Sequence, residues 1–314
     1  MRDLLIDGVR TAPMPRPKTP ISARAKRVKD GLLAWYRTNG RATLPWRATR
    51  DPYRVLVSEL MLQQTQVSRV IPKYHAFLKR FPTVHALARA TPSDVLRAWQ
   101  GLGYNSRALR FHELAKRVSA DNGQFPRTRE ELRALPGIGP YTAGAMMIFA
   151  YDTPDLSVDV NVRRVLARTL LPATASVDAS AIDALALTMI CASGQPHDWH
   201  SALMDLGATV CTARNPACAA CPLRTACINK GPRPEELAAI KKTQSIPFVG
   251  SNRWWRGRIL RAILKRPAKE DALVRAVLER SPSAREEDAF RIALNGLLTD
   301  RIAARERDHI VPVS

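Results

Sequence analysis

Long apolar runs are absent from this chain of 314 residues. The longest strongly apolar stretch, from Ala143 to Tyr151, is far shorter than the roughly 20 residues that a membrane-spanning helix needs. The first 30 residues contain eight Lys or Arg but lack the apolar core of a secretory signal. We therefore expect a cytoplasmic, nucleoid-associated protein that has no membrane partner.

Acidic residues are scarce. The chain has 28 Asp and Glu against 49 Lys and Arg, which gives a formal net charge of +21. A positive excess of this size is typical of proteins that bind a polyanion. Nucleic acid is therefore the first candidate partner, and a membrane surface is the second.

Alternating strand patterns are absent before residue 300, and no internal repeat is visible. Apolar residues instead recur at helical spacing through most of the chain, and Ser22 is placed to cap the first helix. We predict an all-α fold whose further helices lie at 53–65, 67–81, 92–100, 106–122, 128–135, 142–150, 161–171, 178–191 and 199–210.

The stretch from Leu135 to Gly144 predicts a tight turn that leads into a helix. Gly137 and Gly139 flank one apolar residue, and Pro140 suits the first position of a helix because its missing N–H is not needed there. The free N–H groups of such a turn and helix start suit a phosphate. A packing joint between two helices is the alternative interpretation of the same residues.

Four of the five cysteines lie close together near the end of the predicted helices. Cys211, Cys218, Cys221 and Cys227 are separated by six, two and five residues, a density that indicates a metal site. Zinc is one possibility, although its cysteines usually come in two close pairs. A 4Fe-4S cluster, in which four irons each take one thiolate, fits the tight grouping better.

These motifs together resemble a known superfamily. The turn at 135–144, the Val158-Asp159-Val160-Asn161 stretch and the cysteine spacing are similar to those of the endonuclease III superfamily of helix-hairpin-helix DNA glycosylases. The stretches at 44–47, 58–67 and 101–104 resemble the MutY-type adenine-DNA glycosylases within it. The resemblance implies a six-helix barrel domain, a helical domain that holds a 4Fe-4S cluster, and removal of adenine mispaired with 8-oxoguanine or guanine.

Base removal requires a proton for the leaving base and a negative charge beside the sugar cation. Glu59 stands in an apolar helix, where its carboxyl group is suited to donating a proton, although a solvated helix edge is the alternative. Asp159 opens a helix, which keeps a carboxylate ionised, and a plain helix cap is its alternative role. The resemblance implies that Asn161 orients Asp159. Val160 departs from the glycine most common at its position.

The resemblance also assigns residues that contact DNA. Tyr141 occupies the position of the lysine in the bifunctional lyases, which implies a glycosylase without strong lyase activity because no amine forms a Schiff base. The residues that it implies against the duplex, the opposite base or the phosphates are Gln63, Gln64, Tyr104, Gly137, Gly139 and Thr142.

The resemblance and the change in composition after Pro234 divide the chain into segments. We predict a disordered basic arm at 1–24, a cluster domain formed by 25–50 and 155–234, a six-helix barrel domain at 51–154, and a linker at 235–248. Residues 249–314 contain three helical patterns and a possible hairpin, which indicate a small winged-helix-like module. Its shortness leaves open how 8-oxoguanine is recognised, because MutY-type enzymes carry a MutT-like domain there.

We therefore predict a monomeric DNA N-glycosylase of base excision repair that acts on double-stranded DNA with a mismatched or oxidised base pair. A thymine or uracil mismatch glycosylase of the same superfamily is one alternative. A non-catalytic iron-sulfur DNA-binding protein is the other.

Overall fold

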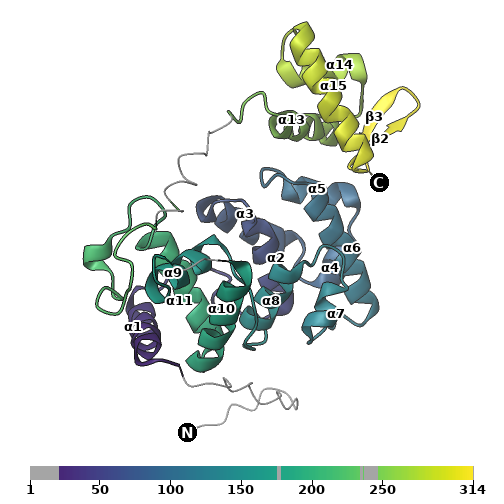
Figure 1. Ribbon diagram of the computed structural model, residues 1–314. Coiled ribbons are helices and arrows are strands. Elements are labelled where there is room, and N and C mark those ends of the chain that lie inside the picture. Colours follow the sequence, from purple (N-terminus) through teal and green to yellow (C-terminus); the bar gives the residue numbers. More distant parts are fainter. Residues whose placement is uncertain (1–20, 175–177, 234–235, 237–246, 314) are drawn as a thin grey trace. The chain divides into compact units, whose positions relative to one another are not determined.

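The computed structural model describes residues 21–174, 178–233, 236 and 247–313 (Figure 1). Most of the predicted arm and of the predicted linker lies outside these residues. The chain forms two compact units, which are described separately below. The first unit comprises Met1–Ala42 and Gly144–Lys241, and the second comprises Thr43–Ala143 and Lys242–Ser314.

The first unit is built from helices that come from both ends of its sequence. Ser22 accepts a hydrogen bond from the amide of Ala25 and so caps the first helix, whose first two residues, Ala23 and Arg24, belong to the predicted arm. This helix packs on α11, while α9 packs on both α10 and α11. The helices are α1 (Ala23–Asn39), α9 (Val160–Leu170), α10 (Ala179–Ser193), α11 (Pro196–Thr209) and the short 3-10 helix η1 (Cys218–Ala220).

The helices of the second unit surround an aromatic core. The ring of Phe77 lies 6.0 Å from that of Phe111 and 5.9 Å from that of Trp99, and all three side chains are fully buried. The helices are α2 (Pro52–Leu62), α3 (Val67–Arg80), α4 (Val84–Ala88), α5 (Pro92–Trp99), α6 (Ser106–Ala120) and α7 (Arg129–Arg133). Helix α8 (Pro140–Phe149) follows, and the boundary between the two units falls within it.

The C-terminal module, residues 249–314, ends the second unit. Its described elements are α13 (Asn252–Lys265), β1 (Ala268–Lys269), α14 (Glu270–Leu278), α15 (Ala284–Thr299), β2 (Ala303–Glu306) and β3 (His309–Pro312). The strands form an antiparallel sheet in the order β1-β3-β2, in which Ile310 pairs with both Ala268 and Arg305. This helix–strand–helix–helix–hairpin order is the arrangement expected of a winged-helix-like module.

The predicted fold class is confirmed: the described chain is mostly helical, with one small sheet near its end. Three short elements were missed. Helix α4 has five residues, the 3-10 helix η1 has three and strand β1 has two, and elements that short carry no periodic pattern in the sequence. Among the described residues, none of the helices has the length and apolar character to cross a membrane.

Candidate functional site

Asp159 caps helix α9 and accepts three hydrogen bonds. Its Oδ1 accepts from the backbone amides of Asn161 and Val162 at 2.8 and 2.7 Å, and its Oδ2 accepts from Asn161 Nδ2 at 3.0 Å. Three donors around one carboxylate stabilise the negative charge and fix the direction of the oxygens. The predicted pairing of Asp159 with Asn161 is therefore present in the structure, and Asp159 is also a helix cap.

A chain of hydrogen bonds leads from Asp159 to the cysteine-rich loop. Arg164 Nη2 donates to Asn161 Oδ1 and to the carbonyl of Gly207, both at 2.7 Å, and Arg164 Nε donates to the carbonyl of Cys211 at 2.8 Å. A Cβ added to Gly207 would lie 2.6 Å from Asn161 Cβ, so only glycine fits there without displacing Asn161. Sequence reasoning missed Arg164 and Gly207. A glycine inside a helix was the available signal.

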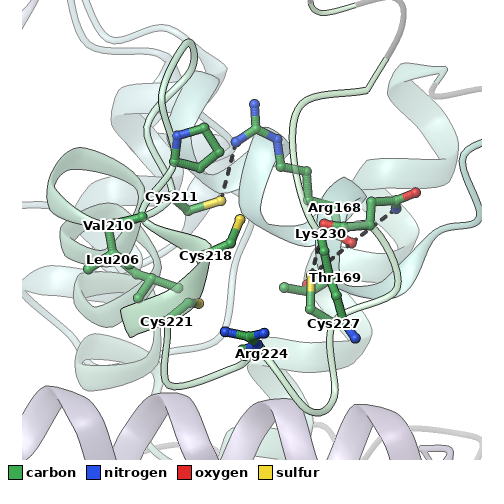
Figure 2. A pocket seen from close by; sticks show the side chains of 13 residues that line it. Arg168, Thr169, Leu206, Val210, Cys211, Cys218, Cys221, Arg224, Cys227 and Lys230 are labelled. Atoms are coloured by element: carbon green, nitrogen blue, oxygen red, sulfur yellow. Dashed lines mark hydrogen bonds between the residues drawn. The ribbon is translucent and has the colours of Figure 1, made fainter.

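The four clustered cysteines line one pocket, called the cysteine pocket below. Figure 2 shows their thiols around a common space, which measures about 400 Å³ with its open solvent included. Among the described residues, no group of three or more Asp, Glu, His or Cys side chains is placed to hold a single metal ion. Four soft thiols that surround a space without converging on a point fit a group larger than a single ion, so they fit a 4Fe-4S cluster.

Cations accompany these thiols. Arg224 and Lys230 line the cysteine pocket, and buried Arg168 donates to Cys211 Sγ at 3.5 Å (Figure 2). Sequence reasoning missed Arg168, which comes from α9, more than forty positions before Cys211 in the chain.

Burial raises the pKa of the Cys211 and Cys221 thiols and raises that of Cys227 to about 11. These thiols are therefore protonated at neutral pH unless a bound metal takes the place of the proton, and metal binding would release protons. The hydrogen bond from Arg168 opposes the effect of burial at Cys211. Cationic neighbours thus ease formation of the thiolates that a metal requires.

Glu59 is buried in helix α2. Its exposed fraction is 7%, and that of its neighbour Ser58 is 1%. The two residues therefore do not form a solvated helix edge, which was the alternative interpretation. Val55, Leu56 and Leu60 on the same helix are also buried, so Glu59 stands on a largely buried stretch of α2.

The end of α2 meets the glycine-rich loop at 101–104. Tyr104 donates a hydrogen bond to Gln64 Oε1, and both residues have a positive φ, 49° and 57°. Arg107 holds this junction, since its guanidinium donates to the carbonyls of Leu60 at 2.6 Å and Gln63 at 2.9 Å. Residues held in the left-handed region concentrate at functional sites. Arg107 was missed because a single arginine in a helix carries no signal.

The predicted turn before α8 is present. Gly137 has φ 81°, a backbone conformation that favours glycine, and a Cβ there would lie a tight 3.1 Å from Arg110 Cβ. Around Gly139 nothing lies within 4 Å of a built Cβ, which leaves room for a ligand. Thr142 is only 3% exposed, and its hydroxyl accepts a hydrogen bond from Gln63 Nε2 at 3.5 Å. Tyr141 is half-buried at the start of α8.

Comparison with known proteins shows that this chain is similar to DNA glycosylases of base excision repair. Residues 57–184 match the model of the HhH-GPD superfamily base excision DNA repair proteins. An adenine DNA glycosylase of Mycolicibacterium smegmatis is 43% identical over 73% of this chain and 78% of its own length. One of Mycobacterium tuberculosis is 40% identical over 88% of this chain and 90% of its own.

Among solved structures, a thermostable thymine-DNA glycosylase is 31% identical to this chain. It superimposes with a TM-score of 0.60 over 65% of this chain and 95% of its own. The helical fold is therefore shared with a thymine-DNA glycosylase.

Proposed function

Because the chain belongs to the family of adenine DNA glycosylases, which remove adenine from DNA in base excision repair, we propose that its substrate is adenine paired with 8-oxoguanine or guanine. The observation that carries the proposal is the carboxylate of Asp159, which three hydrogen-bond donors hold in a fixed orientation at the start of α9. Gln63, Gln64 and Tyr104 lie in stretches that resemble those of the MutY-type enzymes, which supports adenine as the base.

The proposed reaction uses the two carboxyl groups in different protonation states. Glu59 donates its proton to a ring nitrogen of the flipped adenine, and the bond between C1′ and the base breaks with its electron pair leaving on the base. The carboxylate of Asp159 stabilises the positive charge that develops on the sugar. Water then adds to C1′ and loses a proton, which leaves an abasic site. Asn161 keeps Asp159 oriented throughout.

The remaining residues position the DNA. We assign the N–H groups near Gly137, Gly139 and Thr142 to one backbone phosphate, because an open glycine turn at a helix start presents unpaired donors. Gln64 and Tyr104 contact the duplex where the adenine leaves the stack, and Gln63 contacts the opposite base. Tyr141 offers no amine, so the enzyme cleaves the glycosidic bond and leaves the DNA strand intact.

Excision assays on matched duplexes test this substrate. Duplexes with A:8-oxoguanine and A:G are expected to yield abasic sites, visible as strand breaks only after alkaline treatment. Duplexes with T:G and U:G are expected to stay uncut. Thymine or uracil excision without adenine excision would support the first alternative, to which the thymine-DNA glycosylase structure draws attention. Strand breaks before alkali would contradict the assignment of Tyr141.

We further propose that the cysteine pocket holds a 4Fe-4S cluster through Cys211, Cys218, Cys221 and Cys227. When bound, the cluster supplies four strong iron–thiolate bonds that fix the loop from 211 to 227 against α9. The fit rests on four thiols around one space and on the cations that offset their charge. The hydrogen-bond chain from Cys211 through Arg164 to Asn161 then makes the position of Asp159 depend on that loop.

Metal analysis tests the cluster. The purified protein is expected to contain about four irons and four acid-labile sulfides per chain and to absorb visible light. Replacing Cys218 with serine is expected to lower the iron content and the melting temperature. The matched control is Cys191→Ser, because Cys191 is a half-buried cysteine of α10 outside the pocket, and it should keep the full iron content. Zinc bound by the four thiols in place of iron would refute the assignment.

A further inference from the structure

The C-terminal module contains a groove that the base-excision residues do not use. It measures about 660 Å³ and runs between α13 and α14. Basic side chains line it, and its remaining lining is largely small and apolar. We call it the basic groove and define it by Arg258, Arg261, Lys265, Arg266 and Lys269 together with Ala262, Ala268, Ala272 and Ala276.

Two of the five cations in the basic groove are engaged within the module. Arg258 Nε donates to the carbonyl of Val277 at 2.8 Å, and its guanidinium lies 3.8 Å from the carboxylate of Glu279, an acidic residue in the lining. Lys269 pairs with Asp308.

The other three cations, Arg261, Lys265 and Arg266, are exposed. Within the part of the chain that the structure describes, they have no carboxylate partner. Three positive charges in the basic groove are therefore available to a ligand.

Helix α15 is a weaker candidate than α13 for contact with DNA because it carries less positive charge. In winged-helix proteins the last helix commonly enters the DNA groove. Here α15 carries Arg285 and Arg291 against three acidic residues, and Arg291 lies 3.5 Å from one of them, Asp288. Helix α13 carries five basic residues and no acidic one. The positive potential of the module is therefore greater on the α13 side than along α15.

The arrangement of the free cations suits an extended anion. Arg261 and Lys265 are four positions apart on one helix, so they lie about 6 Å apart along its axis, on the same face. Phosphates of one DNA strand follow each other at about 3.4 Å along the duplex axis. A site for one small phosphate would instead need buried donors that converge on a point. The small alanines beside these cations allow a sugar-phosphate backbone to approach closely.

We propose that the basic groove binds the phosphate backbone of duplex DNA and gives the enzyme a second contact surface outside the residues that act on the base. The inference rests on DNA being the substrate and does not depend on which base is removed. The groove contributes affinity independent of sequence and damage, because contacts to phosphates carry no sequence information.

Two triple variants of the full chain test the proposal. The groove variant is Arg261→Gln, Lys265→Gln and Arg266→Gln. The control variant is Arg285→Gln, Arg291→Gln and Arg307→Gln, which removes the same charge from α15 and the hairpin. Fluorescence anisotropy with an undamaged duplex, measured at several NaCl concentrations, should show about a ten- to hundred-fold loss of affinity for the groove variant alone. Its salt slope should fall by about 2 to 3.

The affinities of the two variants, their thermal melting and the excision rate together decide whether the basic groove binds DNA. Equal losses in both variants, or a larger loss in the control, would overturn the proposal, because net charge or α15 would then account for binding. No loss in either variant would also overturn it. Thermal melting should show that both variants are folded, and the single-turnover excision rate at saturating DNA should stay unchanged in the groove variant. Absence of excision by the unmodified enzyme would refute the proposed function and leave the binding comparison intact.

Discussion

Replacing Asp159 with asparagine is expected to lower the single-turnover rate of adenine excision by about 10³-fold, with binding to the duplex retained. Asparagine caps a helix about as well as aspartate, so α9 should keep its N-terminal hydrogen bonds. What disappears is the negative charge beside the developing sugar cation. The measurement is excision from an A:8-oxoguanine duplex with enzyme in excess, alongside duplex affinity by anisotropy.

Asp178→Asn is the matched control, because Asp178 caps α10 in the same unit and its side chain accepts from the amide of Ala181. The control should excise adenine at the normal rate. The two variants separate a catalytic carboxylate from a plain helix cap. If Asp159→Asn excises adenine as fast as the unmodified enzyme, Asp159 is only a cap. Some loss of stability in that variant is expected, because its new amide would face Nδ2 of Asn161.

Replacing Glu59 with glutamine is expected to slow excision by about 10² to 10⁴-fold, the usual contribution of a general acid. Glutamine has nearly the same shape as protonated glutamate and cannot serve as the acid. Because glutamine keeps the size of this buried side chain, the substitution should change the melting temperature little. Excision kinetics, thermal melting and duplex affinity measured together would show whether only the chemical step is lost.

The control for this variant is Glu113→Gln, which makes the same change at an exposed position of α6. A substrate whose base is a better leaving group provides a second check. Such a base needs less help from an acid, so its excision should suffer less from Glu59→Gln than excision of adenine does. Equal slowing for both substrates would argue that Glu59 supports the fold of the site instead of donating a proton.

Apart from the short α4 and η1, the described helices were predictable because they carry local signals. Ser22 was predicted to cap the first helix and does so, and Thr91 and Thr128 cap α5 and α7 in the same way by accepting from the amides of Asp94 and Glu131. Pro140 was placed at the first position of a helix, where α8 begins. Signals of this kind act within four residues, so the sequence displays them directly.

The partners of the candidate site residues were predictable only where they are near in sequence. Asn161 stands two positions after Asp159, and their pairing was expected. Arg107, Arg164 and Arg168 were not expected, because each bonds to a backbone carbonyl or thiol more than forty positions away. An arginine that reaches a carbonyl needs no particular residue type at the other end. Such a contact therefore leaves no pattern in the sequence.

The sequence by itself determined the helical fold class, the family motifs, the grouping of four cysteines and the two candidate carboxyl groups. Only the tertiary structure decided that Glu59 is buried and that Asp159 is linked through Arg164 to the cysteine-rich loop. It also decided that three exposed cations of the basic groove have no carboxylate partner among the described residues. Periodicity and capping depend on neighbours along the chain. Burial and charge pairing depend on neighbours in space, which only the folded chain brings together.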